Sequence, residues 1–356
     1  MDFSAINASI KDPSPAAGVS AREKWNTIAK PLGSLGLLED MVVKIAALTG
    51  KRDVELSKRA VLVFCADNGI VEEGISQTDS SVTMAVAQNL TRKQTSVCRM
   101  AGAAYCDVIP VDAGMNTLPD FDGLISRRGG NGTRNFTKEP AMTRGQAEFL
   151  ITAGIELARD MAELGYNILA TGEMGIGNTT TSSAVCAALL KLPAVQVTGR
   201  GSGLSDSALE KKIDVIEKGL QIHIPAEKLS DIELAITALS CLGGFDIAAM
   251  AGVFIGGAIY RIPVLIDGFI SSVAALVASM LCPKSMIAAL PSHVSGEPAG
   301  RTVLDALELE PVICAGMRLG EGTGAVAALP LLDLTLAVYN SSSSFDELGI
   351  DSYTPQ

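Results

Sequence analysis

The sequence predicts an α/β fold in which helices cover both faces of a mainly parallel sheet. Glycine is abundant, at 35 residues, and aromatic residues make up only 4%, which suits many tight turns between strands and helices. Short apolar runs rich in β-branched residues alternate with segments long enough for helices. The runs are continuous, as in strands buried on both faces of a parallel sheet. They span 59–65, 106–111, 166–171, 262–266 and 285–290, and the clearest helical segments are 143–164 and 207–222.

A separate helical unit is predicted ahead of the first strand. Residues 18–48 contain two helical segments interrupted by KPLGSLG, whose proline and glycines break the helical pattern. We therefore expect residues 1–50 to form the N-terminal part of a small helical domain. Residues 51–335 are expected to form the α/β catalytic domain, and the polar tail 336–356 to join the small domain or a dimer interface.

The composition disfavours nucleic-acid and membrane partners. The net charge is −11 and no basic run occurs, whereas nucleic-acid binding needs clustered Lys and Arg. The apolar stretch 247–282 is divided by Arg261 and Asp267 into pieces shorter than a membrane span, so it predicts a helix, a buried strand and a second helix. The N-terminus has no basic start and no apolar core of a signal peptide, and a cytoplasmic location is expected.

Metal and disulfide chemistry are also disfavoured. The seven cysteines are scattered without a CxxC pair, which is typical of free thiols in a reducing compartment. Only two histidines are present, His223 and His293, too few for a structural zinc site or a histidine-based triad. We expect no metal ligands.

Polar residues follow five of the predicted strands: Asp67, Asp112, Glu173, Asp267 and Ser292. In open α/β sheets the ligand binds beyond the carboxyl ends of the strands, so these residues are expected to face one crevice. Each of them alone is better explained as a cap of the following helix. The five together favour the crevice.

Three glycine-rich or polar segments predict an anion site. GEMGIGNTTTSSA (172–184) follows a strand and leads into a helix, an arrangement that binds phosphate through backbone N–H groups and the helix dipole. It is neither a Walker loop nor a GxGxxG fingerprint, and an ordinary threonine-capped helix is the alternative. GRGSGLSDSALEKKIDVI (199–216) adds Lys211 and Lys212, whose alternative is a solvated helix face. LPSHVSGEPAGR (290–301) adds His293, either a base or a structural histidine.

A single carboxylate stands among glycines in MRLGEGTGA (317–325), where Glu321 lies between Gly320 and Gly322. A solvated turn is the simplest explanation, and a positioned general base is the functional one. The two adjacent acids that bind diphosphate and Mg²⁺ in the usual phosphoribosyltransferases are missing. A ribose phosphate bound here is therefore expected to come from a monophosphate donor.

Seven motifs in order carry a resemblance to a known family: KPLGSLGLLE, CADNG, GEMGIGNTTT, GGFDIAAMAG, VLIDGFISS, PSHVSGE and MRLGEGTGA. Over about residues 20–335 the chain resembles the nicotinate-nucleotide:dimethylbenzimidazole phosphoribosyltransferases of cobamide lower-ligand activation. The resemblance implies a doubly wound α/β domain, a small helical domain from both chain ends, and a dimer. It implies transfer of ribose 5-phosphate from nicotinate mononucleotide to an aromatic acceptor, with no cofactor and no metal, because the leaving nicotinate departs from a cationic pyridinium.

The resemblance also implies roles for individual residues. Glu321 corresponds to the proposed base, and Glu173 to a second carboxylate that steadies positive charge developing on the ribose. The nucleotide loop would use Gly175, Asn178, Thr179 and Thr180, and the phosphate side Gly201, Lys212, Gly268 and Ser295. The expected substrate-binding set is completed by Asp267, Gly320, Gly322, Thr78 and Val86.

Two departures from the family pattern leave the acceptor open. Asn68 stands where the family commonly has His, and Val82-Thr83 is followed by Met84, Ala85 and Val86, where a Gln is usual. Burying the second nitrogen of a benzimidazole unpaired costs about 1–3 kcal/mol, so an apolar pocket suits a phenolic acceptor. The chain is then a homodimeric benzimidazole-using enzyme or a subunit of a phenol- or p-cresol-activating heterodimer. A weakly active, nucleotide-binding partner subunit is the third hypothesis.

Overall fold

The sheet at the centre of the molecule is entirely parallel and six-stranded. The computed structural model describes residues 1–201 and 203–353. The strand order is β3-β2-β1-β4-β5-β6. Because the order reverses between β1 and β4, the sheet is doubly wound, with a switch point between these two strands. The strands are β1 Arg59–Ala66, β2 Cys106–Gly114, β3 Ile125–Ser126, β4 Ile168–Met174, β5 Val264–Ile266 and β6 Ala289–Pro291.

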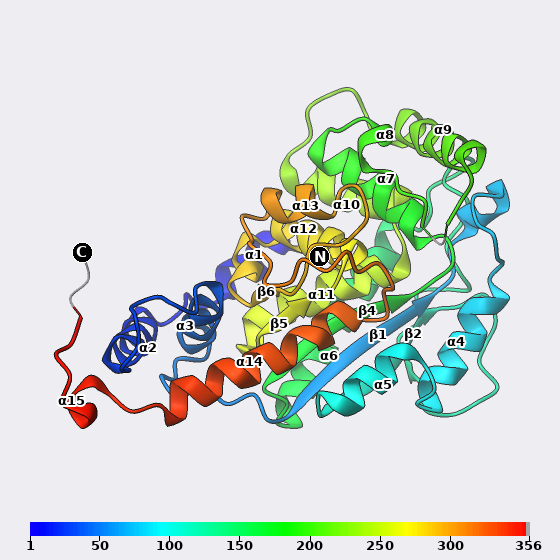
Figure 1. Cartoon of the computed structure of the whole chain (residues 1–356). Helices are drawn as coiled ribbons and strands as arrows, with labels where there is room; N and C mark the ends of the chain where they lie inside the picture. The colour runs from blue at the N-terminus through cyan, green and yellow to red at the C-terminus, as the bar shows by residue number, and fades with distance from the viewer. Residues whose placement is uncertain (202, 354–356) are drawn as a thin grey trace.

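Helices cover both faces of this sheet, as Figure 1 shows. The longer helices are α2 Pro15–Thr27, α3 Leu37–Thr49, α4 Ser81–Thr91, α5 Ser96–Ala103, α6 Arg144–Glu163, α7 Asn178–Leu190, α9 Asp206–His223, α10 Asp231–Leu242, α11 Phe245–Tyr260, α12 Phe269–Leu281 and α14 Thr323–Ser341. The short ones are α1 Phe3–Ser9, α8 Ala194–Val197, α13 Gly300–Ala306, α15 Phe345–Leu348 and the 3₁₀ helices η1 Gly69–Glu73 and η2 Pro283–Ile287.

Strand β1 shows why two faces are covered. All eight of its residues are buried, and successive side chains point to opposite faces. Leu62 and Phe64 pack into a core with helices α6, α7, α10, α11 and α12. Val61 and Val63 pack into a second core with α3, α4, α5 and α14. A continuous apolar strand therefore supplies two cores at once, as the sequence predicts.

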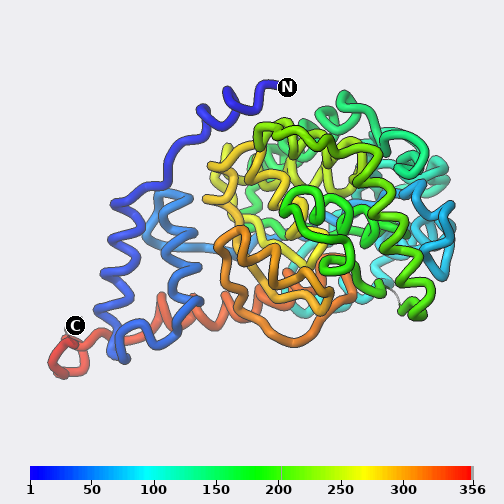
Figure 2. Tube along the Cα trace, turned by 90° about the horizontal axis from the view of Figure 1, so that it is seen from above, coloured from blue at the N-terminus to red at the C-terminus, as the bar shows by residue number. Residues whose placement is uncertain are grey.

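Helices α2 and α3 and the C-terminal segment of the chain form a helical unit beside the α/β body (Figure 2). Helices α2 and α3 pack against each other, and the ring of Trp25 in α2 lies 4.8 Å from that of Tyr339 in α14. Ile28 forms an antiparallel bridge with Ser344. Helix α1 is different, because Phe3 is buried in the core beneath α12.

Most of the predicted elements are present with shifted ends. The stretch 247–282 is a helix, a strand and a helix, as expected. The predicted strand 285–290 is wrong over its first half. Pro283 starts the 3₁₀ helix η2, because its fixed φ suits the first position of a helix, and the strand begins only at Ala289.

One helix of the described chain, α14, is long and apolar enough to cross a bilayer. Half of its most apolar window is buried inside the protein, and Pro330 lies within it. A core helix of a globular protein has these features, so the membrane signal is weak.

Candidate active site

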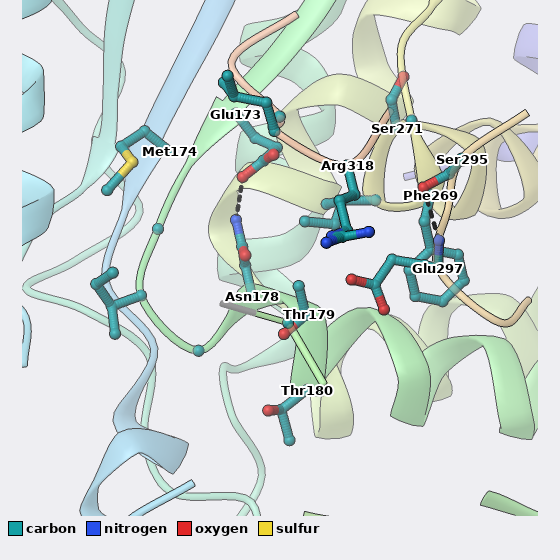
Figure 3. Close-up of a pocket in the computed structure, with 18 of the residues that line it drawn as sticks. Glu173, Met174, Asn178, Thr179, Thr180, Phe269, Ser271, Ser295, Glu297 and Arg318 are labelled. Carbon is teal, nitrogen blue, oxygen red and sulfur yellow. Dashed lines mark hydrogen bonds between the residues drawn. The ribbon is translucent and has the colours of Figure 1, made fainter. Parts of the chain in front are cut away.

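A cavity of about 220 Å³ opens at the carboxyl ends of β4, β5 and β6, next to the switch point of the sheet. Its walls come from the segments after these strands, from the loop before α14, and from Ile75 and Ser76 after β1. This is where open α/β sheets bind ligands. Figure 3 shows part of its lining. The polar side chains of the cavity converge from six separate segments of the chain, so the site exists only in the folded protein.

The loop around Glu321 has a strained backbone packed against its surroundings. Gly320, Glu321 and Gly322 all have positive φ, at 86°, 60° and 87°. This conformation is rare for a residue with a side chain and signals a functional constraint. A Cβ at Gly320 would lie 2.5 Å from Oε1 of Glu173, and one at Gly324 would lie 1.9 Å from Nδ1 of His293. The glycines are therefore required by close contacts, which a solvated turn would not need.

The Glu321 side chain is half-buried at the cavity wall. The Val97 N–H donates to its Oε2 at 3.3 Å, and its own N–H donates to the Glu173 carbonyl at 3.2 Å. Burial raises the pKa of Glu321 above its ordinary value. A carboxylate with a raised pKa is a better proton acceptor near neutral pH.

Asp267 holds this loop in place. Its carboxylate accepts the backbone N–H groups of Gly322 at 3.1 Å, Gly324 at 2.7 Å and Ala325 at 3.0 Å. These groups belong to the N-terminus of α14, where N–H groups have no partner within the helix. Burial nevertheless raises the pKa of Asp267 to about 6. Asp267 lines the cavity and also anchors the segment that carries Glu321.

The glycine-rich loop 175–177 is held at its middle residue, Ile176, by two side chains. The Ile176 N–H donates to Thr83 Oγ1 at 3.2 Å, and the Ile176 carbonyl accepts from Asn68 Nδ2 at 3.2 Å. A Cβ at Gly175 would lie 2.3 Å from the carbonyl oxygen of Ala66, so only glycine fits there. Helix α7 starts directly after this loop. Helix α12 starts after Gly268, which also lines the cavity. Two helix N-termini at one cavity favour an anionic ligand.

Asn178 bridges two buried carboxyl groups. Its Nδ2 donates to Oε2 of Glu173 (dashed in Figure 3) and to Oδ2 of Asp246 at 3.2 Å. Burial, followed by the Asp246 charge, raises the pKa of Glu173 to about 8, and burial raises the pKa of Asp246 to about 6. The amide of Asn178 is therefore occupied by protein partners, and Glu173 is neutral at pH 7.

Lys212 is the buried cation of the site. It is 1% exposed, and its Nζ donates to Thr179 Oγ1 at 2.8 Å and to the Gly199 carbonyl at 3.1 Å. Burial lowers the pKa of Lys212 to about 8. A Cβ at Gly201 would lie 3.1 Å from Thr179 Oγ1, which places this glycine against the same pair. The Glu297 carboxyl acts on Lys212, whose pKa it raises, and Figure 3 shows Glu297 beside Arg318 in the same lining.

Most of the expected site residues line the cavity. They are Glu173, Gly175, Asn178, Thr179, Thr180, Gly201, Lys212, Asp267, Gly268, Ser295, Gly320 and Glu321. Gly322 lies one residue behind, as the N-cap of α14. Thr78 and Val86 do not line it. Thr78 is exposed ahead of α4, and Val86 packs on the core shared with α5 and α14 because of its position on the α4 helix.

The five polar strand ends do not share one crevice. Glu173 and Asp267 line the cavity, and Ser292 lies behind it with its hydroxyl on the Ile266 carbonyl at 2.5 Å. Asp112 pairs with Arg128, and Asp67 accepts the Asn116 N–H at 2.7 Å. These two acids organise the loop after β2, a local structural role in place of the expected crevice or helix cap.

His293 lies in the cavity wall as a packed side chain. Its ring faces the Cα of Gly324, and its Nδ1 is 3.1 Å from Ser292 Oγ. Burial lowers the pKa of His293, which keeps the ring neutral at pH 7. Within the described residues, no group of three or more His, Cys, Asp or Glu side chains is placed to hold a metal ion.

Sequence reasoning missed several side chains of the site, and three charged ones among them are informative. Asp246 follows the glycine pair of GGFDIAAMAG, Glu297 ends PSHVSGE, and Arg318 precedes the LGEG glycines. Each lies inside a motif that was noted as a whole, and charge within a glycine-rich motif is the signal that would have found them. Arg318 and Glu297 both line the cavity, and the Arg318 charge acts on the Glu297 carboxyl.

Comparisons with known proteins agree with this geometry. A phosphoribosyltransferase family profile matches residues 10–350. The nicotinate-nucleotide–dimethylbenzimidazole phosphoribosyltransferase of Acetivibrio thermocellus is 44% identical over 335 residues, 94% of each chain. That of Ruminiclostridium cellulolyticum is 41% identical over 355 residues, 100% of this chain and 99% of the relative. The crystal structure of CobT from Thermus thermophilus superposes with a TM-score of 0.88 at 36% identity, covering 95% of this chain and 100% of that one. This chain is therefore an enzyme that belongs to the nicotinate-nucleotide–dimethylbenzimidazole phosphoribosyltransferase family.

Proposed function

We propose that this enzyme transfers ribose 5-phosphate from nicotinate mononucleotide to 5,6-dimethylbenzimidazole, releasing nicotinate and forming an α-ribotide for cobamide synthesis. The observation that carries the proposal is Glu321, a half-buried carboxylate with a raised pKa, which faces a cavity walled by two helix N-termini and a buried lysine. The site thus combines a base with an anion-binding wall. The names of the relatives supply the two substrates.

The chemistry requires one base and no redox step. A ring nitrogen of the acceptor attacks C1 of the ribose, and the bond from C1 to the pyridinium nitrogen breaks with its electron pair going to nicotinate. The acceptor then carries a surplus proton on its other ring nitrogen. The Glu321 carboxylate accepts that proton from a distance of about 3 Å. Positioning of the acceptor against C1 supplies most of the remaining acceleration.

The phosphate of the donor is assigned to the side of the cavity away from Glu321. Lys212, Ser295 and Arg318 supply side-chain donors there, and the N-termini of α7 and α12 supply backbone N–H groups. Gly201 and Gly268 allow the backbone to approach the ligand closely.

Replacement of Lys212 is expected to weaken donor binding. Lys212→Met keeps the length of the buried stem and removes the charge, so KM for nicotinate mononucleotide should rise about 10- to 100-fold, with a smaller effect on KM for the acceptor. Steady-state kinetics with each substrate varied in turn measure this. Lys211→Met, on the preceding residue outside the cavity lining, is the matched control and should leave both constants unchanged. Equal changes in the two KM values would contradict the assignment.

The proposed function is tested by a direct assay of the purified chain. Nicotinate mononucleotide is mixed with dimethylbenzimidazole or with phenol, and the ribotide is separated by chromatography. Product with dimethylbenzimidazole alone supports the proposal. Product with phenol and none with dimethylbenzimidazole would show that the acceptor is phenolic. Tight binding of the mononucleotide without turnover would show that the chain is a partner subunit.

We also propose a cytoplasmic dimer, built with the small helical domain of residues 1–50 and the tail 336–356. Trp25 and Tyr339 join the two chain ends in one unit that stands beside the catalytic body, where a second chain can pack. A homodimer is expected, with a heterodimer of two similar chains as the alternative. Light scattering of the purified chain should give twice the mass of 36.9 kDa.

A further inference from the structure

Glu173 and Asp246 form a buried acidic pair, and no cation of the described residues 1–201 and 203–353 acts on either group. Glu173 is 8% exposed and Asp246 is 0% exposed. The charged groups that face Glu173 are acids from three elements: Asp246 on α11, Asp267 after β5, and Glu321 before α14. Lys212 turns its Nζ to Thr179 and Gly199 instead. Two buried carboxylates in this setting cannot both ionise cheaply, so one of them keeps a proton.

The surroundings of the pair decide which carboxyl keeps the proton. Asp246 lies in the first turn of α11 and accepts the Ile247 N–H at 2.9 Å, so the helix N-terminus favours its charged form. Glu173 lies at the end of β4 and has only the shared Asn178 amide, with its Oε1 against Gly320. The negative charge therefore belongs on Asp246 and the proton on Glu173. The raised pKa values of about 6 for Asp246 and about 8 for Glu173 agree with this order.

We propose that Asp246 is a positioning residue whose negative charge, opposed by the shared Asn178 amide, keeps Glu173 in its neutral, hydrogen-bond-donating form, and that this neutral acid receives the anionic mononucleotide. The inference rests on the proposed function, because nicotinate mononucleotide carries a phosphate and a carboxylate. An ionised Glu173 would repel such a ligand across a low-dielectric site. A neutral carboxyl instead donates a hydrogen bond to the ligand. An enzyme molecule whose Glu173 is ionised before binding therefore takes up one proton when the mononucleotide binds.

The test measures proton uptake when nicotinate mononucleotide binds. Calorimetric titrations at each pH, in two buffers of different ionisation enthalpy, give the number of protons bound with the ligand. Uptake by the wild-type enzyme should be largest above pH 8, between the pKa of Glu173 in the free enzyme, about 8, and its higher pKa in the complex. Lys212 contributes there as well, because its pKa is also lowered to about 8. The Glu173→Gln variant removes only the Glu173 share and separates the two.

Two substitutions should shift the proton uptake that is due to Glu173 in opposite directions along the pH axis. Asp246→Asn removes the neighbouring charge, so the uptake should shift by about one pH unit to lower pH. Asn178→Ser removes the amide that stabilises the carboxylate, so the uptake should shift to higher pH. If Asp246→Asn does not fold, Asn178→Ser carries the test. Asp112→Asn is the matched control, a buried acid at the end of β2 that pairs with Arg128 and does not act on Glu173.

The Glu173→Gln background decides whether Asp246 acts through Glu173. In that background Asp246→Asn should cause no further shift. Three results would each overturn the inference. They are an unshifted uptake profile in Asp246→Asn, an Asp246→Asn shift of the same size with and without Glu173, and proton release on binding. If the enzyme binds and turns over its substrates but the Asp246→Asn profile is unshifted, only this inference fails. If the wild-type enzyme does not bind the mononucleotide, the inference and the proposed function both fail.

Discussion

The Glu321→Gln variant should bind nicotinate mononucleotide normally and transfer ribose phosphate about 10²- to 10⁴-fold more slowly, because general base catalysis contributes a factor of that size. The amide keeps the shape of the side chain and cannot accept the proton. The loss should lie in kcat, with little change in KM for the donor. Quenched time-course assays of ribotide formation measure the loss in kcat. Calorimetry with the mononucleotide measures its binding separately.

The pH profile gives a second readout of the same variant. The active form of a base is the carboxylate, so activity falls as pH drops through the pKa of Glu321. Because burial raises this pKa, the acid limb should lie above the ordinary 4.5 of a glutamate. The limb should vanish in Glu321→Gln. Glu308→Gln is a matched control, since Glu308 also has a positive φ, at 56°, and is exposed away from the cavity. A Glu321→Gln enzyme with wild-type kcat would refute the base.

The Asp267→Ala variant should lose both stability and activity. Three backbone N–H groups at the start of α14 lose their acceptor, which costs about 2–4 kcal/mol of the free energy of unfolding. The loop bearing Glu321 then loses its anchor, and kcat should fall about 10²-fold from misplacement of the base. Urea denaturation and steady-state kinetics measure the two losses.

A comparison with Asp305→Ala isolates the role of this anchor. Asp305 is an exposed carboxylate paired with Arg301 on α13, and its loss should change stability by less than about 0.5 kcal/mol and leave kcat intact. Asp267→Asn keeps one acceptor oxygen and should fall between the wild type and Asp267→Ala. Wild-type kcat in a folded Asp267→Ala enzyme would show that the anchor does not position Glu321.

The order of strands and helices was predictable because it depends on local pattern. Continuous apolar runs such as 59–65 can be buried on two faces only within a parallel sheet, and β1 supplies both cores. The first half of 285–290 was predicted wrongly, because an apolar run does not distinguish a strand from a 3₁₀ turn that a preceding proline starts. The surroundings of Val86 could not be predicted for a related reason, and its role at the acceptor stays a prediction. The face of α4 that meets the core is decided by packing against other helices.

The amino-acid sequence by itself determined the fold class, the family and the identity of the residue proposed as the base. Sequence motifs are local signals, and the seven motifs occurring in order over about residues 20–335 identify the family. The tertiary structure decided what each charged residue does. The sequence shows Asp267 as one more acid after a strand, whereas the fold aims it at three N–H groups of α14. It shows Asn178 as part of a nucleotide-binding loop, whereas the fold places its amide between Glu173 and Asp246. Burial and the distance between charges set these roles, and both arise only when segments far apart in the chain meet.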